Sequence, residues 1–324
     1  MLLEVSELAV DVATRGGFQR VVDRTSFSLV EGESLGVVGE SGSGKTMTAL
    51  ALMALTPEGA RVSGSIRFEG RELVGLTEEE MLQLRGDRIA MIFQEPMTAL
   101  NPLRRVGAQV AEPLMLHRDL SKREAQARAV GLLERVRLAE PERAARSYPF
   151  QLSGGERQRA MIAMAIGCTP RLVIADEPTT ALDVTVQARI LALIDGLRSE
   201  SKMAILLVSH DLAVIAGHCD RVIVMYAGMI MESGPVEAVL RQPRNPYTLA
   251  LLEARPRPGA PRGARLKTIP GAPPAQHEHN VGCPFAGRCP LTVPICRSVT
   301  PPMVAFEAAH VSRCHRAHEV GAAP

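Results

Sequence analysis

The sequence lacks three features that would each define a class of protein: an excess of charge, a secretion signal and a long apolar run. Lys plus Arg number 37 against 35 for Asp plus Glu, a formal net charge of +2, whereas general nucleic-acid binding needs a concentrated basic surface. Acidic residues at Glu4, Glu7 and Asp11 and the absence of a basic segment argue against a signal peptide. The longest apolar runs, about 47–55 and 160–166, are far shorter than the ~20 residues of a membrane helix. We therefore expect no nucleic-acid partner, and membrane association only through a partner protein.

Aromatic residues and cysteines are also scarce. Aromatics make up 3% of the chain, tryptophan is absent, and only two of the six cysteines, Cys168 and Cys219, precede residue 281. These two lie in apolar surroundings and are expected to be small core residues. With 46% hydrophobic residues, the chain has ample material for a buried core.

Hydrophobic patterns predict an α/β protein interrupted by a helical stretch. Alternating residues favour strands over 3–38, and the texture of 77–145 is helical, with Ser121 and Glu124 as a capping box. The α/β rhythm returns after about 168, and a hairpin is predicted with its turn at Ala227-Gly228. The further elements expected are a helix at 46–55, a strand at 171–176, a helix at 184–200 and a strand at 204–210. Strands alternating with helices imply a mainly parallel sheet.

The stretch "GESGSGKT" matches the phosphate-binding pattern G-x-x-x-x-G-K-[ST] between a predicted strand and a predicted helix. Its glycines let backbone N–H groups face a phosphate, and the helix N-terminus adds a dipole that favours anions. Lys45 is expected to reach the β- and γ-phosphates, and the Thr46 hydroxyl to bind Mg²⁺. The nucleotide-binding residues predicted here are Gly39, Ser41, Gly42, Ser43, Gly44, Lys45 and Thr46.

The stretch "RLVIADEPTTALD" supplies two carboxylates at the end of a buried strand. Asp176 is expected to hold Mg²⁺ through water, and Glu177 to polarise an attacking water as a general base. A lone Asp-Glu pair after a strand is usually only a solvated strand end, but the phosphate loop upstream favours the catalytic interpretation.

The stretch "LSGGERQR" opens a helix with Ser153, Gly154 and Gly155, which would present N–H donors to a second anion. Together with the two motifs above, it resembles the ATP-binding cassette ATPases, in which LSGGE is the signature sequence. The resemblance covers residues 1–240. It implies head-to-tail dimers in which the signature of one subunit closes the phosphate loop of another, and hence a second cassette, identical or paralogous.

The resemblance also assigns residues outside these motifs. Gln94 in "MIFQEP" matches the glutamine that contacts Mg²⁺ and water and moves with the transmembrane partner, and His210 in "LLVSHD" matches the histidine at the γ-phosphate. Asp183 matches the loop that communicates across the dimer. Such cassettes usually stack adenine on an aromatic residue near the N-terminus; the expected place offers Val12, so Phe18 is assigned instead.

Four cysteines lie near the C-terminus with the spacing C-x₅-C-x₆-C-x₁₇-C: Cys283, Cys289, Cys296 and Cys314. In a reducing cytosol, clustered cysteines are more often metal ligands than disulfides. Zinc, an iron–sulfur cluster, a pair of disulfides and free thiols are all compatible with the pattern, although structural zinc usually has closer C-x₂₋₄-C pairs. Five histidines in this region are expected to be polar surface residues: His277, His279, His310, His315 and His318.

The stretches "QEPMTALNP", "NPYTLALLEA" and "GCPFAGRCP" resemble the ATPases of oligopeptide/dipeptide importers and their C-terminal extension. In some of those proteins the four cysteines hold a 4Fe–4S cluster, which we hypothesise here. The resemblance implies two transmembrane permease subunits, an external solute-binding protein, and a peripheral position at the cytoplasmic face of the inner membrane. Importers of nickel, glutathione or another solute belong to the same group, and a soluble, non-transport cassette ATPase is the alternative class.

The expected fold is therefore α/β: a P-loop NTPase of the ABC cassette type with a mainly parallel core sheet, an N-terminal antiparallel β part, an inserted helical subdomain and a small Cys-rich C-terminal extension. The predicted boundaries are 1–240 for the cassette, about 90–165 for its helical subdomain, 241–281 for a Pro/Gly-rich linker with a short helix, and 282–324 for the Cys-rich region. The expected cofactors are ATP and Mg²⁺, and the hypothesis for the four cysteines adds a 4Fe–4S cluster.

Overall fold

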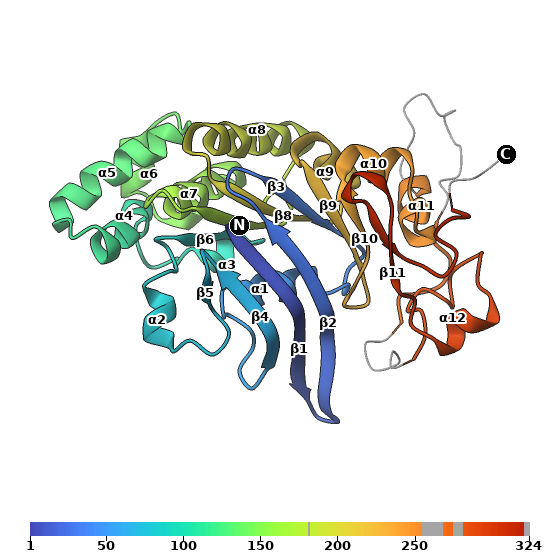
Figure 1. Cartoon of the computed structure of the whole chain (residues 1–324). Coiled ribbons are helices and arrows are strands. Elements are labelled where there is room, and N and C mark those ends of the chain that lie inside the picture. Colours follow the sequence, from blue (N-terminus) through green and yellow to red (C-terminus); the bar gives the residue numbers. More distant parts are fainter. Residues whose placement is uncertain (181, 255–267, 275–280, 321–324) are drawn as a thin grey trace. The chain divides into compact units, whose positions relative to one another are not determined.

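The computed structural model describes residues 1–180, 182–254, 268–274 and 281–320 (Figure 1). The chain divides into two compact units, which are described separately. The first comprises Met1–Leu2, Leu29–Ser34 and Gly75–Val208, and the second comprises Leu3–Ser28, Leu35–Val74 and Ser209–Pro324.

Three parallel strands form the centre of the first unit: β6 (Ile89–Ile92), β7 (Leu172–Asp176) and β8 (Ala204–Ser209). Every residue in them is buried, which is why their sequences are continuous apolar runs rather than alternating ones. Strands β7 and β8 confirm the prediction. Strand β6 lies inside a stretch that was expected to be helical.

Helices make up most of the rest of this unit. Helix α4 packs against α5, α6 and α7, and Figure 1 shows this helical insertion in green. The predicted capping box is present: the Glu124 N–H donates to Ser121 Oγ (3.4 Å), and the Ser121 N–H donates to the Glu124 carboxylate (3.0 Å). The helices are α2 (Glu78–Leu82), α3 (Pro96–Ala99), α4 (Val106–His117), α5 (Lys122–Arg135), α6 (Pro141–Arg146), η1 (Pro149–Gln151), α7 (Gly154–Ile166) and α8 (Val184–Ser201).

A four-stranded sheet opens the second unit, with the strand order β2-β1-β4-β5. Strand β1 pairs antiparallel with β4, which in turn pairs antiparallel with β5, so the expected antiparallel N-terminal part is confirmed. The strands are β1 (Leu3–Thr14), β2 (Gly17–Leu29), β4 (Arg61–Phe68) and β5 (Arg71–Glu72), of which the last two lie outside the predicted β region.

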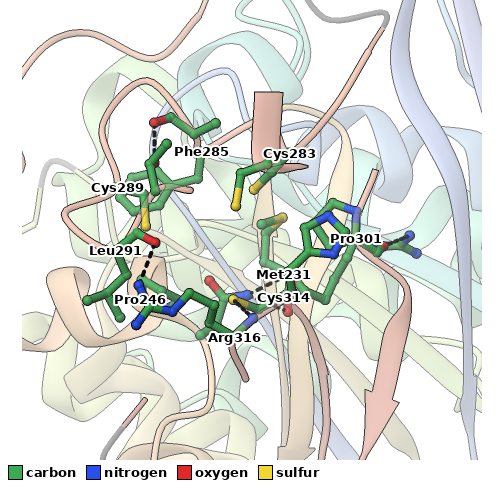
Figure 2. Close-up of a pocket in the computed structure, with 15 residues that line it drawn as sticks. Met231, Pro246, Cys283, Phe285, Cys289, Leu291, Pro301, Cys314 and Arg316 are labelled. Atoms are coloured by element: carbon green, nitrogen blue, oxygen red, sulfur yellow. Dashed lines mark hydrogen bonds between the residues drawn. The ribbon is translucent and has the colours of Figure 1, made fainter. Parts of the chain in front are cut away.

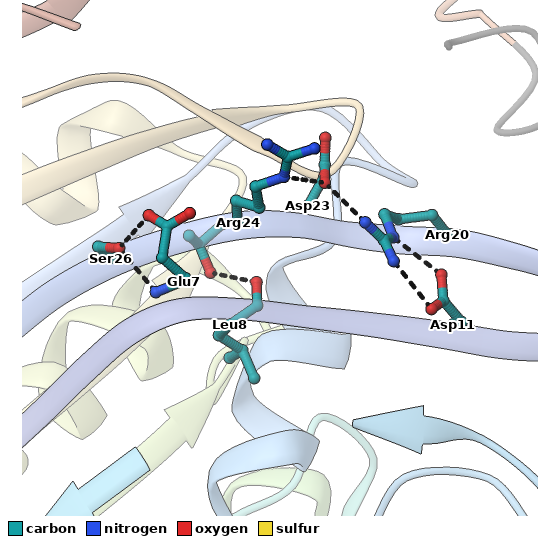
Figure 3. A network of polar contacts seen from close by, with 8 residues as sticks. Glu7, Leu8, Asp11, Arg20, Asp23, Arg24 and Ser26 are labelled. Carbon is teal, nitrogen blue, oxygen red and sulfur yellow. Dashed lines mark hydrogen bonds and ion pairs between the residues drawn. The ribbon is translucent and has the colours of Figure 1, made fainter. Parts of the chain in front are cut away.

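Charged side chains link β1 to β2 (Figure 3). The Arg20 guanidinium donates to both carboxylate oxygens of Asp11 (2.9 and 3.1 Å) and to Asp23 (3.2 Å). The hydrogen bond from Arg20 lowers the pKa of Asp11. Because the Arg20 side chain is 43% exposed, this network contributes little more than about 1 kcal/mol to stability.

A second set of strands in this unit mixes both directions. Strand β3 (Ser34–Val38) runs parallel to β9 (Arg221–Tyr226), and β9 pairs antiparallel with β10 (Met229–Pro235). The predicted hairpin turn is confirmed, with φ of 47° at Ala227 and 81° at Gly228, the positive values a tight hairpin turn requires. Strand β10 also pairs with β12 (Val311–Arg313), which pairs with β11 (Met303–Ala305). The Cys-rich region therefore extends this sheet by two antiparallel strands.

The other elements of the second unit are α1 (Lys45–Leu52), α9 (Leu212–His218), α10 (Val236–Arg241), α11 (Pro246–Glu253), α12 (Pro294–Ser298) and η3 (Glu307–Ala309). Of the helices in the described part of the chain, none has both the length and the apolarity needed to cross a membrane.

Candidate active site

The glycine-rich loop of residues 39–46 follows β3 and leads into α1, as the phosphate-binding pattern predicts. Gly42 and Gly44 have φ of 75° and 98°, a backbone conformation that other residues rarely adopt. At Gly39 the restriction is space, because a Cβ atom there would lie 2.2 Å from the carbonyl oxygen of Met225 on β9. All three glycines are therefore required by the backbone.

The side chain of Lys45 turns back onto its own loop. It is 5% exposed, and Nζ donates to the carbonyl oxygens of Gly39 and Glu40, both at 2.9 Å. The exposed residues of the loop are Ser41, Gly42 and Thr46. A fixed ammonium group, exposed backbone and a hydroxyl in the first turn of a helix are the groups that bind a triphosphate and its Mg²⁺.

The two predicted carboxylates lie at the end of β7 in the first unit. Asp176 is 3% exposed. Glu177 has a φ of 44°, and its N–H donates to the carbonyl oxygen of Val208 on β8 (3.0 Å). A left-handed conformation is unfavourable for glutamate, and such strained residues are often found at functional sites.

The Glu177 carboxylate is held by two donors within this unit. Gln94 Nε2 and Thr180 Oγ1 both donate to Glu177 Oε2, at 3.2 and 2.9 Å. Two of the three predicted catalytic residues thus contact each other although they are 83 positions apart. Thr180 was missed by the sequence analysis; its position three residues after Glu177, in a turn, is the only local signal for it.

The signature stretch begins α7 as predicted. Ser153 is the N-cap: its Oγ accepts from the Glu156 N–H (3.3 Å), and the Glu156 carboxylate accepts from the Ser153 N–H (2.8 Å). The Glu156 carboxylate accepts from the Ser153 N–H and from Ser153 Oγ (2.7 Å); these two hydrogen bonds, together with nearby Arg143, lower the pKa of Glu156. Gly154 and Gly155 form the first turn and are half-buried, so this helix terminus combines a defined geometry with a dipole suited to an anion.

Asp183 is the N-cap of the neighbouring helix α8 and is exposed. Its carboxylate accepts from the backbone N–H groups of Thr185 (3.0 Å) and Val186 (2.9 Å). A Cβ atom on Gly155 would lie 3.0 Å from Val186 Cγ1, so the signature helix and the start of α8 are in close contact. Ala181 lies outside the described residues.

Two further predicted site residues, His210 and Phe18, belong to the second unit, like the glycine-rich loop. His210 follows β8 and is exposed; the next residue, Asp211, caps α9 through the Ala213 N–H (2.6 Å). Phe18, at the start of β2, is 48% exposed, and the Arg61 guanidinium lies 3.6 Å from its ring centroid. Arg61 thus covers one face of this ring.

The four C-terminal cysteines line a single pocket (Figure 2), together with side chains of β10, α11 and the tail. The described cysteines are free thiols, and burial raises the pKa of Cys283 to about 12 and also raises those of Cys289 and Cys314. The four thiols are the right number and kind of donor for a metal centre. However, among the residues described, no group of three or more His, Cys, Asp or Glu side chains is arranged to hold a metal ion. The arrangement therefore does not support the expected iron–sulfur cluster.

The expectation for the other cysteines and for the histidines is only partly met. Cys168 is buried and Cys219 is half-buried. His310 is not a surface residue: it is 4% exposed, and its Nε2 lies 2.7 Å from the carboxylate of Glu232, which is fully buried on β10. His277 and His279 lie outside the described residues.

Three residues around the glycine-rich loop were missed by the sequence analysis. The Glu40 N–H donates to the Tyr247 hydroxyl (2.9 Å), and the Glu40 carboxylate pairs with Arg288 at 2.6 and 3.0 Å. No sequence pattern indicates these contacts, because they join residues more than 200 positions apart.

Two known families match this chain, one toward its N-terminal end and the other toward its C-terminal end. The family described as "ABC transporter" matches residues 22–180, and the one described as "Oligopeptide/dipeptide transporter, C-terminal region" matches residues 231–296.

Curated relatives match almost the whole chain. The oligopeptide transport ATP-binding protein OppD of Salmonella typhimurium is 49% identical over 316 residues, which cover 98% of this chain and 94% of that protein. The OppD protein of Escherichia coli is 49% identical over 97% of this chain and 93% of its own length. A probable peptide ABC transporter ATP-binding protein of Sinorhizobium fredii, y4tR, is 46% identical over 99% of this chain and 96% of its own.

Solved structures match the cassette part. The dimeric post-hydrolysis state of the ATP-binding cassette MJ0796 bound to ADP and Pi has a TM-score of 0.66 and 27% identity, and covers 72% of this chain and 99% of that one. A second dimeric structure of MJ0796, described as a bacterial ABC transporter cassette, has a TM-score of 0.65 at the same identity and the same coverage.

Proposed function

We propose a function from one premise: this chain belongs to the ABC transporter family, with the C-terminal region of its oligopeptide/dipeptide transporters. It hydrolyses ATP as the nucleotide-binding subunit that powers an importer of oligopeptides or dipeptides. The observation that carries this proposal is the 49% identity to an oligopeptide transport ATP-binding protein over 98% of the chain.

The glycine-rich loop binds the triphosphate in this proposal. Lys45 leaves the carbonyl oxygens it now contacts and neutralises the β- and γ-phosphates, while the N–H groups of the loop receive the remaining oxygens. Thr46, Gln94 and Asp176 are assigned to Mg²⁺, which would neutralise the charge that develops on the phosphates. Phe18 is assigned to adenine through the ring face that Arg61 does not cover.

Glu177 is the proposed general base. Its Oε2 atom already accepts hydrogen bonds from Gln94 and Thr180, which restrict the orientation of the carboxylate. A carboxylate so oriented can remove a proton from the attacking water, and His210 is assigned to the γ-phosphate.

The remaining site residues act on a partner. Ser153, Gly154 and Gly155 are assigned to the triphosphate of a second cassette, and Asp183 to communication across the dimer. Support comes from the capped terminus of α7, where Ser153 is exposed, and from the dimeric cassettes among the similar structures. The second cassette is a paralogue or a copy of this chain.

The importer context supplies the other partners. We assign this chain to the cytoplasmic face of the inner membrane, bound through Gln94 and the residues after it to two permease subunits. An external solute-binding protein would deliver the peptide. The support is the match to transporter ATP-binding proteins together with the matched C-terminal region.

The general base is tested by Glu177→Gln, which keeps the shape of the side chain and removes its basicity. ATP binding should persist while turnover falls at least about 100-fold, the usual contribution of a general base. Glu200→Gln is the matched control, because Glu200 is an exposed acid in the same unit that pairs with Arg135 on the surface. Hydrolysis by Glu177→Gln at the rate of this control would contradict the assignment.

A separate proposal concerns the four cysteines, to which we assign a 4Fe–4S cluster. The number of thiols and their shared pocket support it, whereas their described arrangement does not yet form a ligand set. Iron, sulfide and zinc should be measured in protein purified without oxygen, beside a Cys289→Ser variant. Near-stoichiometric iron and sulfide that disappear in the variant would support the cluster; zinc alone, or no metal, would overturn it and leave the ATPase proposal intact.

A further inference from the structure

Glu40 occupies the second position of the phosphate-binding pattern, and all of its polar groups are engaged. Its N–H donates to the Tyr247 hydroxyl (2.9 Å), and its carbonyl oxygen accepts from Lys45 Nζ (2.9 Å). Its carboxylate accepts two hydrogen bonds from Arg288, at 2.6 and 3.0 Å. One loop residue thus joins the phosphate-binding lysine to two side chains from the C-terminal part of the chain.

Arg288 is itself held in place from several sides. Its side chain is 7% exposed, and it also donates to the Pro270 carbonyl oxygen (2.9 Å) and to the Tyr226 hydroxyl (3.1 Å). The hydrogen bond from Glu40 raises the pKa of the Arg288 guanidinium, which therefore stays charged. The Arg288 side chain is buried and the Glu40 side chain is 24% exposed, so the pair is partly buried. An arginine–carboxylate pair with two parallel hydrogen bonds has a defined geometry, and removal of one partner leaves the other charge unpaired.

Three aromatic rings fix the elements that carry these contacts. The ring centroids of Tyr226 on β9, Tyr247 on α11 and Phe285 in the tail lie 4.6 to 5.4 Å apart, and each side chain is at most 1% exposed. Aromatic packing at these distances is favourable and rigid. The cluster holds residues 283–289 of the tail against the two tyrosines whose hydroxyls reach Glu40 and Arg288.

The same tail segment carries thiols. Phe285 lines the cysteine pocket, and Arg288 directly precedes Cys289, whose side chain lines that pocket too (Figure 2). Any change that displaces Cys289 must therefore act on the backbone of its neighbour, Arg288.

We propose that Arg288 is a positioning residue for the phosphate loop: acting through Glu40, and together with Tyr247, it holds the loop in the conformation that receives the triphosphate. This inference rests on the proposed ATP-binding function. It makes the Cys-rich region part of the nucleotide site's support, so that the state of the cysteine pocket and the affinity for ATP are linked in both directions.

The test is the dissociation constant of the full-length protein for MgATP, measured in the Glu177→Gln background so that no hydrolysis occurs. Arg288→Ala should raise this constant about tenfold or more, because the loop would no longer be held in the binding conformation and MgATP would have to order it. Arg288→Lys keeps the charge but cannot make two parallel hydrogen bonds to the carboxylate. Its dissociation constant should lie between that of the Glu177→Gln parent and that of Arg288→Ala. Arg297→Ala is the matched control: this exposed arginine follows Cys296 as Arg288 precedes Cys289, and it should change the constant less than twofold.

Two more variants distinguish a role of Arg288 in positioning the phosphate loop from a role in stabilising the tail alone. Tyr247→Phe removes only the hydroxyl that accepts from the loop N–H, and it should also raise the constant. Glu40→Gln combined with Arg288→Ala should be no worse than the more affected single variant, because both act through one contact. Circular dichroism and the melting temperature report folding for every variant.

The outcomes are distinct. If Arg288→Ala has a lowered melting temperature but the same dissociation constant for MgATP as Arg297→Ala, Arg288 only stabilises the fold and the inference is wrong. If Arg288→Ala does not fold, unchanged affinities of Arg288→Lys and Tyr247→Phe overturn the inference equally well. If the Glu177→Gln protein itself does not bind MgATP, the proposed function fails first.

Discussion

Replacement of Gly44 by alanine should damage the phosphate loop by a calculable amount. A Cβ atom at this position would lie 2.8 Å from the carbonyl oxygen of Val21 and 3.3 Å from Gly228 Cα. Both neighbours are backbone atoms, and they are tied together: the Gly228 N–H donates to Ser43 O (3.0 Å), and the Gly228 carbonyl oxygen accepts from the Asp23 N–H (2.8 Å). The loop, β2 and the β9–β10 turn therefore cannot separate without losing hydrogen bonds.

Two costs add at this position. Gly44 has a φ of 98°, and placing alanine in a left-handed conformation costs roughly 1–2 kcal/mol. The enforced contact with Val21 adds about 1–3 kcal/mol, the usual cost of overpacking. Alanine also reduces the conformational freedom of the unfolded chain, which offsets about 0.4–1 kcal/mol, so we expect a loss of about 1–4.5 kcal/mol in the free energy of unfolding.

A control isolates the contact from the backbone conformation. Gly70 has a φ of 81°, but a Cβ atom there would meet no atom within 4 Å, so Gly70→Ala should cost only about 1 kcal/mol. Urea unfolding followed by circular dichroism gives the two midpoints, and MgATP binding should weaken in Gly44→Ala alone. Equal midpoints for the two variants, with unchanged MgATP binding in both, would refute this reasoning.

Two further predictions use the buried thiols and the exposed aromatic ring. Because burial raises the pKa of Cys283 to about 12, only about one thiol in 10⁴ is ionised at pH 8. Alkylation of Cys283 by iodoacetamide in metal-free protein should therefore be slow, rise about tenfold per pH unit and become fast in guanidinium; rapid, pH-independent reaction of Cys283 would contradict its burial. Phe18→Ala should raise the dissociation constant for MgATP at least about fivefold, since base stacking contributes roughly 1–3 kcal/mol. Tripolyphosphate binding should not change, and an equal loss for both ligands would exclude adenine stacking.

Features set by residues close together in sequence could be predicted. The glycine-rich loop between β3 and α1, the capping box of Ser121 and Glu124, and the Ala227-Gly228 turn each depend on fewer than about ten positions. In each case a backbone requirement restricts the residue types, so the pattern identifies the structure.

Elements stabilised by distant partners were missed. Strand β6 has only four residues and lies among helices, so periodicity could not distinguish it from a buried helix segment. Strands β11 and β12 have three residues each and exist because β10 offers an edge for pairing. His310 was expected at the surface because histidine is polar, but its contact with buried Glu232 depends on that same pairing of β10 with the tail.

The contacts of Glu40 show why a motif describes only part of a site. The phosphate-binding pattern leaves this position unspecified, because the loop binds phosphates through backbone N–H groups and not through the side chain at this position. An unspecified side chain is available for another interaction, and in this chain it is a carboxylate bound by an arginine 248 positions away. Since Lys45 donates to the carbonyl oxygen of the same residue, a displacement of the Arg288 pair must also change the environment of the lysine that receives the triphosphate. The position that the motif leaves open is thus the one through which the C-terminal region can act on the nucleotide.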